Sequence, residues 1–111
     1  MDKIKINENT LVIGNKVVPF DKKILEVKVF NGRIIVLLEL DGSLDNVYCV
    51  DSGGGLLWRI KEPDKGIIGN NRYPYVGISL TEKCMAVVDF YGRKLYVDIN
   101  SGKIIDKEIV K

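Results

Sequence analysis

The sequence predicts an all-β, antiparallel fold, and three observations lead to this. Apolar and polar residues alternate in many short segments, as in Glu26-Val27-Lys28-Val29. Turns containing glycine or asparagine separate these segments at short intervals. No long stretch shows the 3.6-residue apolar period of an amphipathic helix. The pattern indicates roughly ten or eleven short strands.

The first half of the chain divides into an N-terminal hairpin and a four-stranded unit. The hairpin is predicted from 11–13 and 16–20, which flank the turn Gly14-Asn15. The longest apolar run, Ile34–Leu38, lies between Asn-Gly and Asp-Gly turns and is predicted as a central strand. Gly53-Gly54-Gly55 favours a tight turn because glycine adopts positive φ at little cost. The four strands of the unit are predicted at 25–30, 33–40, 47–50 and 56–60.

The second half has the same organisation, and the two halves match as an internal repeat. Strands are predicted at 75–80, 84–90, 93–99 and 103–110. Residues 30–40 match residues 80–90 at an offset of 50. Val47-Tyr48-Cys49 matches Leu95-Tyr96-Val97 at an offset of 48, which also pairs Gly54 with Gly102. The repeat units therefore span 24–60 and 75–109, each a four-stranded antiparallel sheet.

Residues 47–58, Val-Tyr-Cys-Val-Asp-Ser-Gly-Gly-Gly-Leu-Leu-Trp, resemble the blade repeat of quinoprotein-type (PQQ-type) β-propellers. That repeat ends in an apolar-Tyr-apolar-apolar-Asp strand, a glycine turn and a strand with tryptophan, and Asp51, Gly54 and Trp58 fall on this pattern. The resemblance implies that Trp58 docks between adjacent blades. The second copy departs from the pattern, with Ile99 in place of the aspartate and Asp106 in place of the tryptophan. The resemblance implies no quinone or metal site.

The length limits how such blades can be arranged. Closed propellers usually have about 4–8 blades of four strands, and 111 residues hold two blades and a short leading segment. We expect a single domain over 1–111 in which the two sheets pack as a sandwich or open barrel rather than a closed propeller. The alternatives are assembly of several chains into a propeller-like ring, and a likeness that is only local, with the sheet arranged otherwise.

The composition argues against catalysis and against most cofactors. Histidine, the commonest general base and metal ligand, is absent. Cys49 and Cys84 lie in apolar runs and are predicted to pack as small core residues of a reduced, cytoplasmic chain. We expect no enzyme activity, no cofactor and no metal. Glu39, Asp41, Asp45 and Asp51 form a loose acidic group, which we interpret as solvated turns.

Charge and hydropathy point to a protein partner. The net charge is +2, and basic residues are interspersed with acidic ones, so we expect no nucleic-acid binding. No apolar segment approaches the ~20 residues that a membrane helix needs, and the first residues show no signal-peptide core. The sequence therefore favours a small non-catalytic protein-binding module, such as an inhibitor or immunity-type protein. A structural oligomer and a carboxylate-based ligand-binding or enzyme fragment remain the alternatives.

The connection 61–74 between the two repeats is the candidate binding segment. Long connections are often functional, although a plain linker is the alternative interpretation. Arg, Tyr and Trp, which dominate interface hot spots, gather around it. The predicted protein-binding residues are Trp58, Arg59, Lys61, Arg72, Tyr73 and Tyr75.

Overall fold

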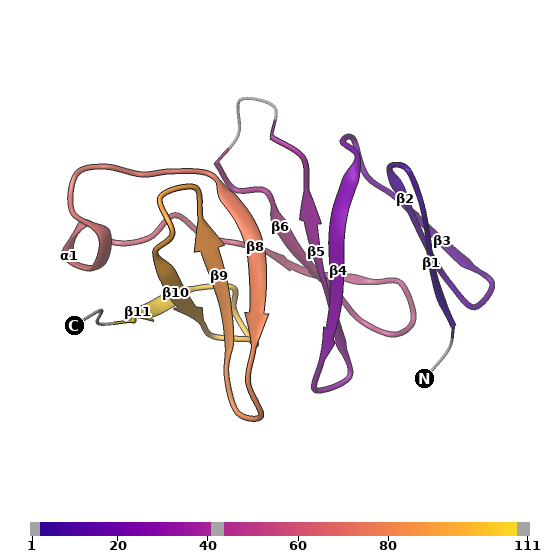
Figure 1. Ribbon diagram of the computed structural model, residues 1–111. Coiled ribbons are helices and arrows are strands. Elements are labelled where there is room, and N and C mark those ends of the chain that lie inside the picture. Colours follow the sequence, from indigo (N-terminus) through magenta and orange to yellow (C-terminus); the bar gives the residue numbers. More distant parts are fainter. Residues whose placement is uncertain (1–2, 41–43, 109–111) are drawn as a thin grey trace.

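The computed structural model describes residues 3–40 and 44–108 (Figure 1). Within them, the chain forms eleven strands and one short helix, α1 (Lys65–Ile68). None of the described residues belongs to a helix of the length and apolarity that crossing a membrane requires. The strands are β1 (Ile4–Asn7), β2 (Thr10–Ile13), β3 (Lys16–Pro19), β4 (Ile24–Phe30), β5 (Arg33–Leu38), β6 (Val47–Val50), β7 (Leu56–Arg59), β8 (Tyr75–Leu80), β9 (Met85–Asp89), β10 (Lys94–Val97) and β11 (Ile104–Lys107).

The strands form three antiparallel sheets, and none of the three closes into a barrel. We call them the N-terminal sheet (β1–β3), the middle sheet (β4–β7) and the C-terminal sheet (β8–β11). They stack side by side in chain order, so that the middle sheet lies between the other two (Figure 1). The all-β prediction with two repeated four-stranded sheets is confirmed. The predicted N-terminal hairpin is instead a three-stranded sheet, because Ile4–Asn7 adds β1 to β2.

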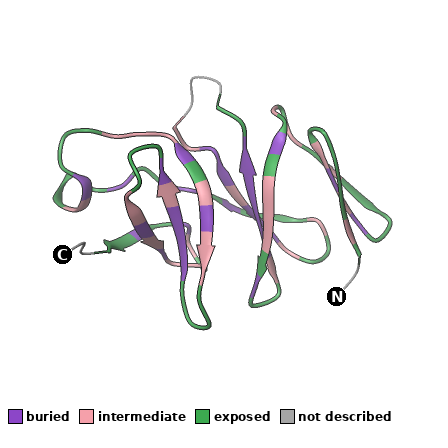
Figure 2. Ribbon diagram, viewed as in Figure 1, coloured by how far each residue is buried: buried purple, intermediate pink, exposed green. Residues whose placement is uncertain are grey.

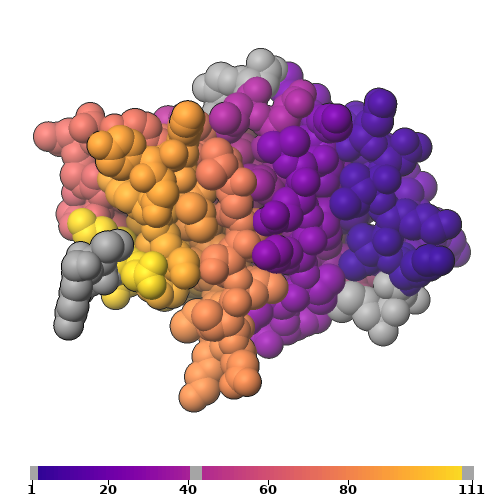
Figure 3. Space-filling view, viewed as in Figure 1, coloured from indigo at the N-terminus to yellow at the C-terminus, as the bar shows by residue number. Residues whose placement is uncertain are grey.

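The middle sheet holds the molecule together because β5 is buried on both faces (Figure 2). Ile35 and Leu37 face a core shared with the C-terminal sheet. Ile34, Val36 and Leu38 face a second core shared with the N-terminal sheet. A continuous run of β-branched and aliphatic residues is what a strand needs when both of its faces are dry. Figure 3 shows β8 lying directly beside β4 on one side of this stack.

The internal repeat is present in the structure, in a register shifted by one residue. Pairing with the neighbouring strand shifts between Ile24 and Glu26 in β4, and between Tyr75 and Gly77 in β8. These equivalent irregularities are 51 positions apart, so the offset of 50 was one residue short. In the third strands, β6 and β10, the pairing shifts after Cys49 and after Tyr96. These positions are 47 residues apart, so the offset between the third strands is 47 and not the predicted 48.

The one-residue correction changes which faces correspond. Because side chains alternate across a strand, a slip of one residue exchanges the two faces. In the corrected register Ile34 and Val36 correspond to Met85 and Val87. The first pair faces the N-terminal sheet and the second faces the middle sheet. The middle and C-terminal sheets therefore each present the same face to the sheet before them.

The N-terminal sheet follows the same plan but lacks one strand. The amide N–H of Phe20 donates to the carbonyl of Asn9 just as Ile60 donates to Val47 in the middle sheet. This correspondence matches β2 with β6 and β3 with β7, and leaves β1 in the place of β5. No described residue takes the place of β4 in the N-terminal sheet.

An aspartate organises the turn between the last two strands of both four-stranded sheets. The Asp51 carboxylate accepts hydrogen bonds from the amides of Gly53 and Gly55. In the C-terminal sheet Asp98 holds this place and accepts from the Asn100 amide. The expectation that Ile99 replaces the aspartate was therefore wrong. The strands before Asp51 and Asp98 both have four residues, and the turn that begins at Asp98 is one residue longer.

Trp58 is buried between the middle and C-terminal sheets. Its indole Nε1 donates a hydrogen bond of 2.7 Å to the Ile99 carbonyl. Its ring covers Gly102, where an added Cβ would lie 2.6 Å from the ring. The N-terminal and middle sheets make the same kind of contact, because a Cβ on Gly54 would lie 3.3 Å from a Val18 methyl. Both glycines have positive φ, so the turn can present its bare backbone to the neighbouring sheet.

The two cysteines are free thiols in unlike surroundings. Cys49 is buried in the core between the middle and C-terminal sheets, as predicted. Cys84 is exposed in the β8–β9 turn, so its predicted core position was wrong. Residues 81–84 form a polar turn, in which the Thr81 hydroxyl accepts from the Cys84 amide. The apolar run begins only at Met85.

We expect alkylation to distinguish the two thiols. Burial raises the pKa of Cys49 to about 11, so this thiol stays protonated and unreactive near pH 8. Iodoacetamide should label one cysteine in the folded chain and two in denaturant, as read by mass spectrometry. Labelling of Cys49 as fast as Cys84 in the folded chain would contradict this prediction.

The raised pKa of Cys49 also predicts that the free energy of unfolding falls above pH 9, because the thiol of the unfolded chain then ionises first.

Candidate protein-binding surface

Five connections gather at one end of the three sheets, the upper end in Figure 1. They follow β1, β3, β5, β7 and β9, and the opposite end carries mostly short hairpin turns. The connection 61–74 and the turn 90–93 lie together at this end, above the C-terminal sheet. Most of the residues that sequence analysis selected for binding lie in or beside these connections.

The structure places two of those residues in the interior. Trp58 and Tyr75 are both buried in the core between the middle and C-terminal sheets. We therefore leave them out of the binding surface. Burial raises the pKa of the Tyr75 phenol, an effect that the nearby Arg72 guanidinium partly offsets.

The remaining four are exposed or partly exposed and do not form one group, although Arg59 and Arg72 both contact Asp45. The Arg59 guanidinium lies over the Tyr48 ring and donates to the Asp45 carbonyl. Arg72 forms an ion pair with the Asp45 carboxylate. Lys61 is exposed, and its amide donates to the Gly102 carbonyl.

Arg93, which the sequence analysis did not select, fixes the connection 61–74 in place. Its guanidinium donates to the carbonyl of Ile68 at 2.8 Å and to that of Asn71 at 2.9 Å. Its Nε donates to the buried Asp89 carboxylate at 2.7 Å. This segment, expected without structure of its own, contains α1 and is tied to the C-terminal sheet. A signal for the turn was present, since an aspartate before a glycine is typical of a turn capped by its side chain, and the Asp89 carboxylate accepts from the amides of Tyr91 and Arg93.

Tyr73, Phe90 and Tyr91, which we call the aromatic cluster, lie beside this anchor, and the Phe90 amide donates to the carbonyl of Pro74, next to Tyr73. The rings of Tyr73 and Tyr91 stack with centroids 5.2 Å apart and planes 13° apart. The Arg93 guanidinium lies 5.2 Å from the Tyr73 ring centroid. Phe90 is 64% exposed and Tyr91 is 75% exposed. Two large aromatic side chains thus stand in solvent on a support that is fixed by charge and stacking.

A buried asparagine fixes the middle sheet against the start of β8. The Asn46 side-chain amide donates to the carbonyls of Leu38 and Tyr75, each at 2.9 Å. Its oxygen accepts from the Tyr75 amide at 3.3 Å. The upper end of β8, next to the aromatic cluster, is therefore held to the middle sheet by hydrogen bonds within the core.

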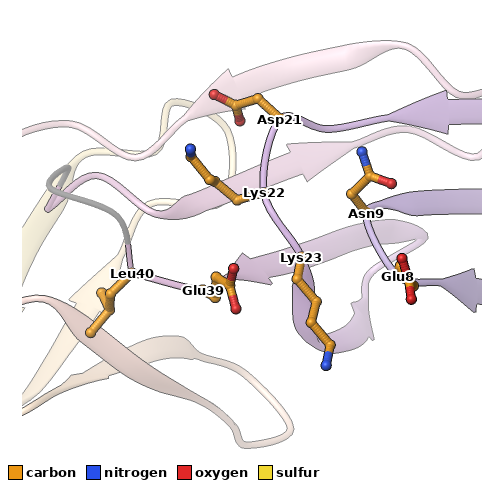
Figure 4. A pocket seen from close by; sticks show the side chains of 7 residues that line it. All are labelled: Glu8, Asn9, Asp21, Lys22, Lys23, Glu39 and Leu40. Atoms are coloured by element: carbon orange, nitrogen blue, oxygen red, sulfur yellow. The ribbon is translucent and has the colours of Figure 1, made fainter.

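A cleft of about 520 Å³ lies at the same end, between the N-terminal and middle sheets (Figure 4). Glu8 and Asn9 of the β1–β2 turn form one side. Glu39 and Leu40 after β5 form the other, and residues 21–23 pass between them. Carboxylates and lysines alternate around the cleft, so its charge is mixed.

The predicted acidic group is dispersed in the structure. Asp51 caps its own turn and Asp45 pairs with Arg72, while Asp41 lies outside the described residues. Across 3–40 and 44–108, no three Cys, Asp or Glu side chains come together as a metal-binding group.

Comparison with known proteins identifies the family. The model of a domain of unknown function, DUF7957, matches residues 1–109. The chain therefore belongs to the DUF7957 family. No curated protein and no solved structure matches the chain significantly.

Proposed function

We propose that this chain is a non-catalytic protein-binding module that contacts its partner through the aromatic cluster Tyr73, Phe90 and Tyr91. The observation that supports this most strongly is the exposure of Phe90 and Tyr91 on a rigid base. Exposed aromatic groups of this kind mark interaction sites, because they lose water without losing much side-chain entropy on binding. An inhibitor or immunity-type protein that covers a partner's surface would use such a feature.

The arrangement favours a protein over a small ligand. Phe90 and Tyr91 are mostly exposed, whereas a small-molecule site is concave and buries most of its ligand. Arg93 beneath the cluster is held by three acceptors, so its guanidinium is already ordered before binding. Pre-ordered aromatic and arginine side chains give affinity because little conformational freedom remains to be lost.

We expect loss of the cluster to abolish partner capture. The tagged chain and its F90S/Y91A variant would be used to capture proteins from cells of the source, followed by mass spectrometry. L56S is the control, because Leu56 is exposed to a similar degree on β7. A protein retained by the chain and by L56S, but lost with F90S/Y91A, would support the proposal. Equal capture by all three would contradict it.

We also propose that the three sheets are successive blades of the quinoprotein-type propeller repeat. Two observations support this: the middle and C-terminal sheets use equivalent faces toward the sheet before them, and a ring or methyl contacts a positive-φ glycine at both junctions. The cytoplasm is the compartment we propose, since both cysteines are free thiols.

The outer face of the C-terminal sheet favours a single chain over a ring of several chains. Lys94 and Glu108 form an ion pair at 3.8 Å. They occupy the places of Val47 and Ile60, which are buried between sheets. Charged outer faces are typical of the capping units of repeat proteins, because they prevent further stacking. We expect light scattering to give the 12.5 kDa mass of one chain at high concentration. A mass that rises with concentration to a multiple of this value would favour the ring of several chains.

A further inference from the structure

Among the described residues the N-terminal sheet has no fourth strand, and apolar side chains of β1 and β4 are exposed beside the vacant edge, which we call the slot. Ile6 of β1 is 48% exposed, whereas its counterpart Ile35 in β5 is fully buried. Val29 of β4 is 41% exposed. Val27 is half-buried, whereas its counterpart Ile78 in β8 is only 5% exposed. In the middle sheet β4 is present and contacts β8 (Figure 3), and we attribute the greater exposure in the N-terminal sheet to the lack of an equivalent strand among its described residues.

The open edge of β1 has the hydrogen-bonding groups that a strand requires. The Lys3 carbonyl accepts from the Gly14 amide, so Lys3, Lys5 and Asn7 direct their backbone groups to β2. The alternation of an antiparallel ladder leaves the N–H and C=O groups of Ile4 and Ile6 on the open side. A sheet edge with free backbone groups beside apolar side chains is the setting in which an extended peptide adds as a strand.

The junction between the middle and C-terminal sheets specifies which side chains the added strand should carry. There Ile78, on the inner edge of β8, has its amide bonded to the Glu26 carboxylate at 2.9 Å. Its carbonyl accepts from the Lys28 ammonium at 3.0 Å. Val27 is the counterpart of Ile78, and the ladder directs its N–H and C=O to the same open edge. A strand added to β1 would therefore supply partners for the backbone N–H and C=O of Val27 if it had an acidic and a basic residue two positions apart.

We propose that the β1 edge is a strand-addition site for an extended segment of a partner protein with the pattern Glu-x-Lys-x-aromatic. The aromatic residue corresponds to Phe30, which is buried against the C-terminal sheet in the middle-sheet version of this contact. In the proposed complex the segment runs antiparallel to β1. Its lysine pairs with Ile6 as Lys28 pairs with Ile35. The site is separate from the aromatic cluster, which lies above the C-terminal sheet.

The sequence of β4 itself provides the probe, because it has the required pattern. A synthetic peptide Ile-Leu-Glu-Val-Lys-Val-Phe would be titrated into the full chain, and amide hydrogen exchange would be followed by NMR. We expect added protection at the amides of Ile4, Ile6 and Val27. A peptide with the glutamate and lysine exchanged should bind roughly fivefold more weakly. The exchange would place the ammonium beside the Val27 N–H and the carboxylate beside the Val27 C=O, where neither can form its hydrogen bond.

Variants of the chain separate this site from other surfaces. I6K places a charge in the slot and should weaken peptide binding roughly tenfold. V17K is its control, because Val17 is an exposed residue on β3 of the same sheet. F90S/Y91A should bind the peptide like the unmodified chain, so the two proposals fail independently. Protection at β11 in place of β1, or equal binding by I6K, would overturn the inference. Dimerisation of the chain that I6K abolishes would also overturn it, since a second copy would then occupy the edge.

Discussion

Gly102→Ala should destabilise the protein by about 3–4 kcal/mol, one of the two largest effects that we expect. The new Cβ would lie 2.6 Å from the Trp58 ring, and φ at this position is 77°. Overpacking in a dense interior costs about 1–3 kcal/mol, and the left-handed backbone adds about 1–2 kcal/mol for a residue with a Cβ. Chemical denaturation of both chains would measure the difference.

A matched glycine separates the steric cost from the backbone cost. Gly92 also has a positive φ, 88°, but an added Cβ there meets nothing within 4 Å. Gly92→Ala should therefore cost only the backbone strain, about 1–2 kcal/mol. The clash should also shrink when Gly102→Ala is combined with Trp58→Ala, which gives a less than additive double-mutant cycle. Equal losses for Gly92→Ala and Gly102→Ala would contradict the Trp58 contact.

Arg93→Ala should destabilise the protein by about 3 kcal/mol. The substitution leaves the Asp89 carboxylate buried without a charged partner, and it removes the donors to Ile68 and Asn71. Breaking a buried ion pair costs about 3–5 kcal/mol, and the lower end applies because the guanidinium is partly exposed. Denaturant unfolding would give the loss. Limited proteolysis should cut within 61–74 faster than in the unmodified chain.

Two further variants identify the cause. Arg93→Lys keeps the charge but loses the planar guanidinium with its several donors, so its stability should lie between that of the unmodified chain and that of Arg93→Ala. Asp89→Asn in the Arg93→Ala background removes the unpaired charge and should recover part of the stability. If Arg93→Ala leaves both stability and proteolysis unchanged, Arg93 does not anchor the connection.

The strands were predictable from sequence because each carries a local signal. Period-two alternation and glycine turns identified β4 to β11 in the correct order. β1 was missed as a strand although Ile4 and Ile6 alternate with polar residues, because the segment is short and mostly exposed. Cys84 was misplaced for a related reason, since nothing local separates a polar turn from the end of an apolar run.

Register was less predictable than the strands themselves. β5 and β9 are apolar on both faces, so aligning the two repeat units at an offset of 50 or of 51 residues gives a similar match in hydropathy. Only the ladder irregularities after Ile24 and Tyr75 distinguish the two. This one-residue difference decides which faces meet, and so it could not be obtained from composition or periodicity.

The binding surface was predictable only in part. Arg72 and Tyr73 were selected by residue type and position, and Tyr73 belongs to the aromatic cluster. Phe90, Tyr91 and Arg93 come from a turn that is distant in sequence, and only the fold brings them beside 61–74. The slot at β1 was not predictable, because it arises from comparing equivalent positions in three sheets.

The repeated contact between sheets is the central claim, and NMR tests it most directly. Trp58 is the only tryptophan, so its ring protons are assigned without ambiguity. We expect nuclear Overhauser contacts from the Trp58 ring to the Gly102 α-protons and from the Val18 methyls to the Gly54 α-protons. The Gly102 α-protons should also be shifted upfield by the ring current. Absence of both contacts, with Gly102 at ordinary chemical shifts, would contradict the stacking of the three sheets.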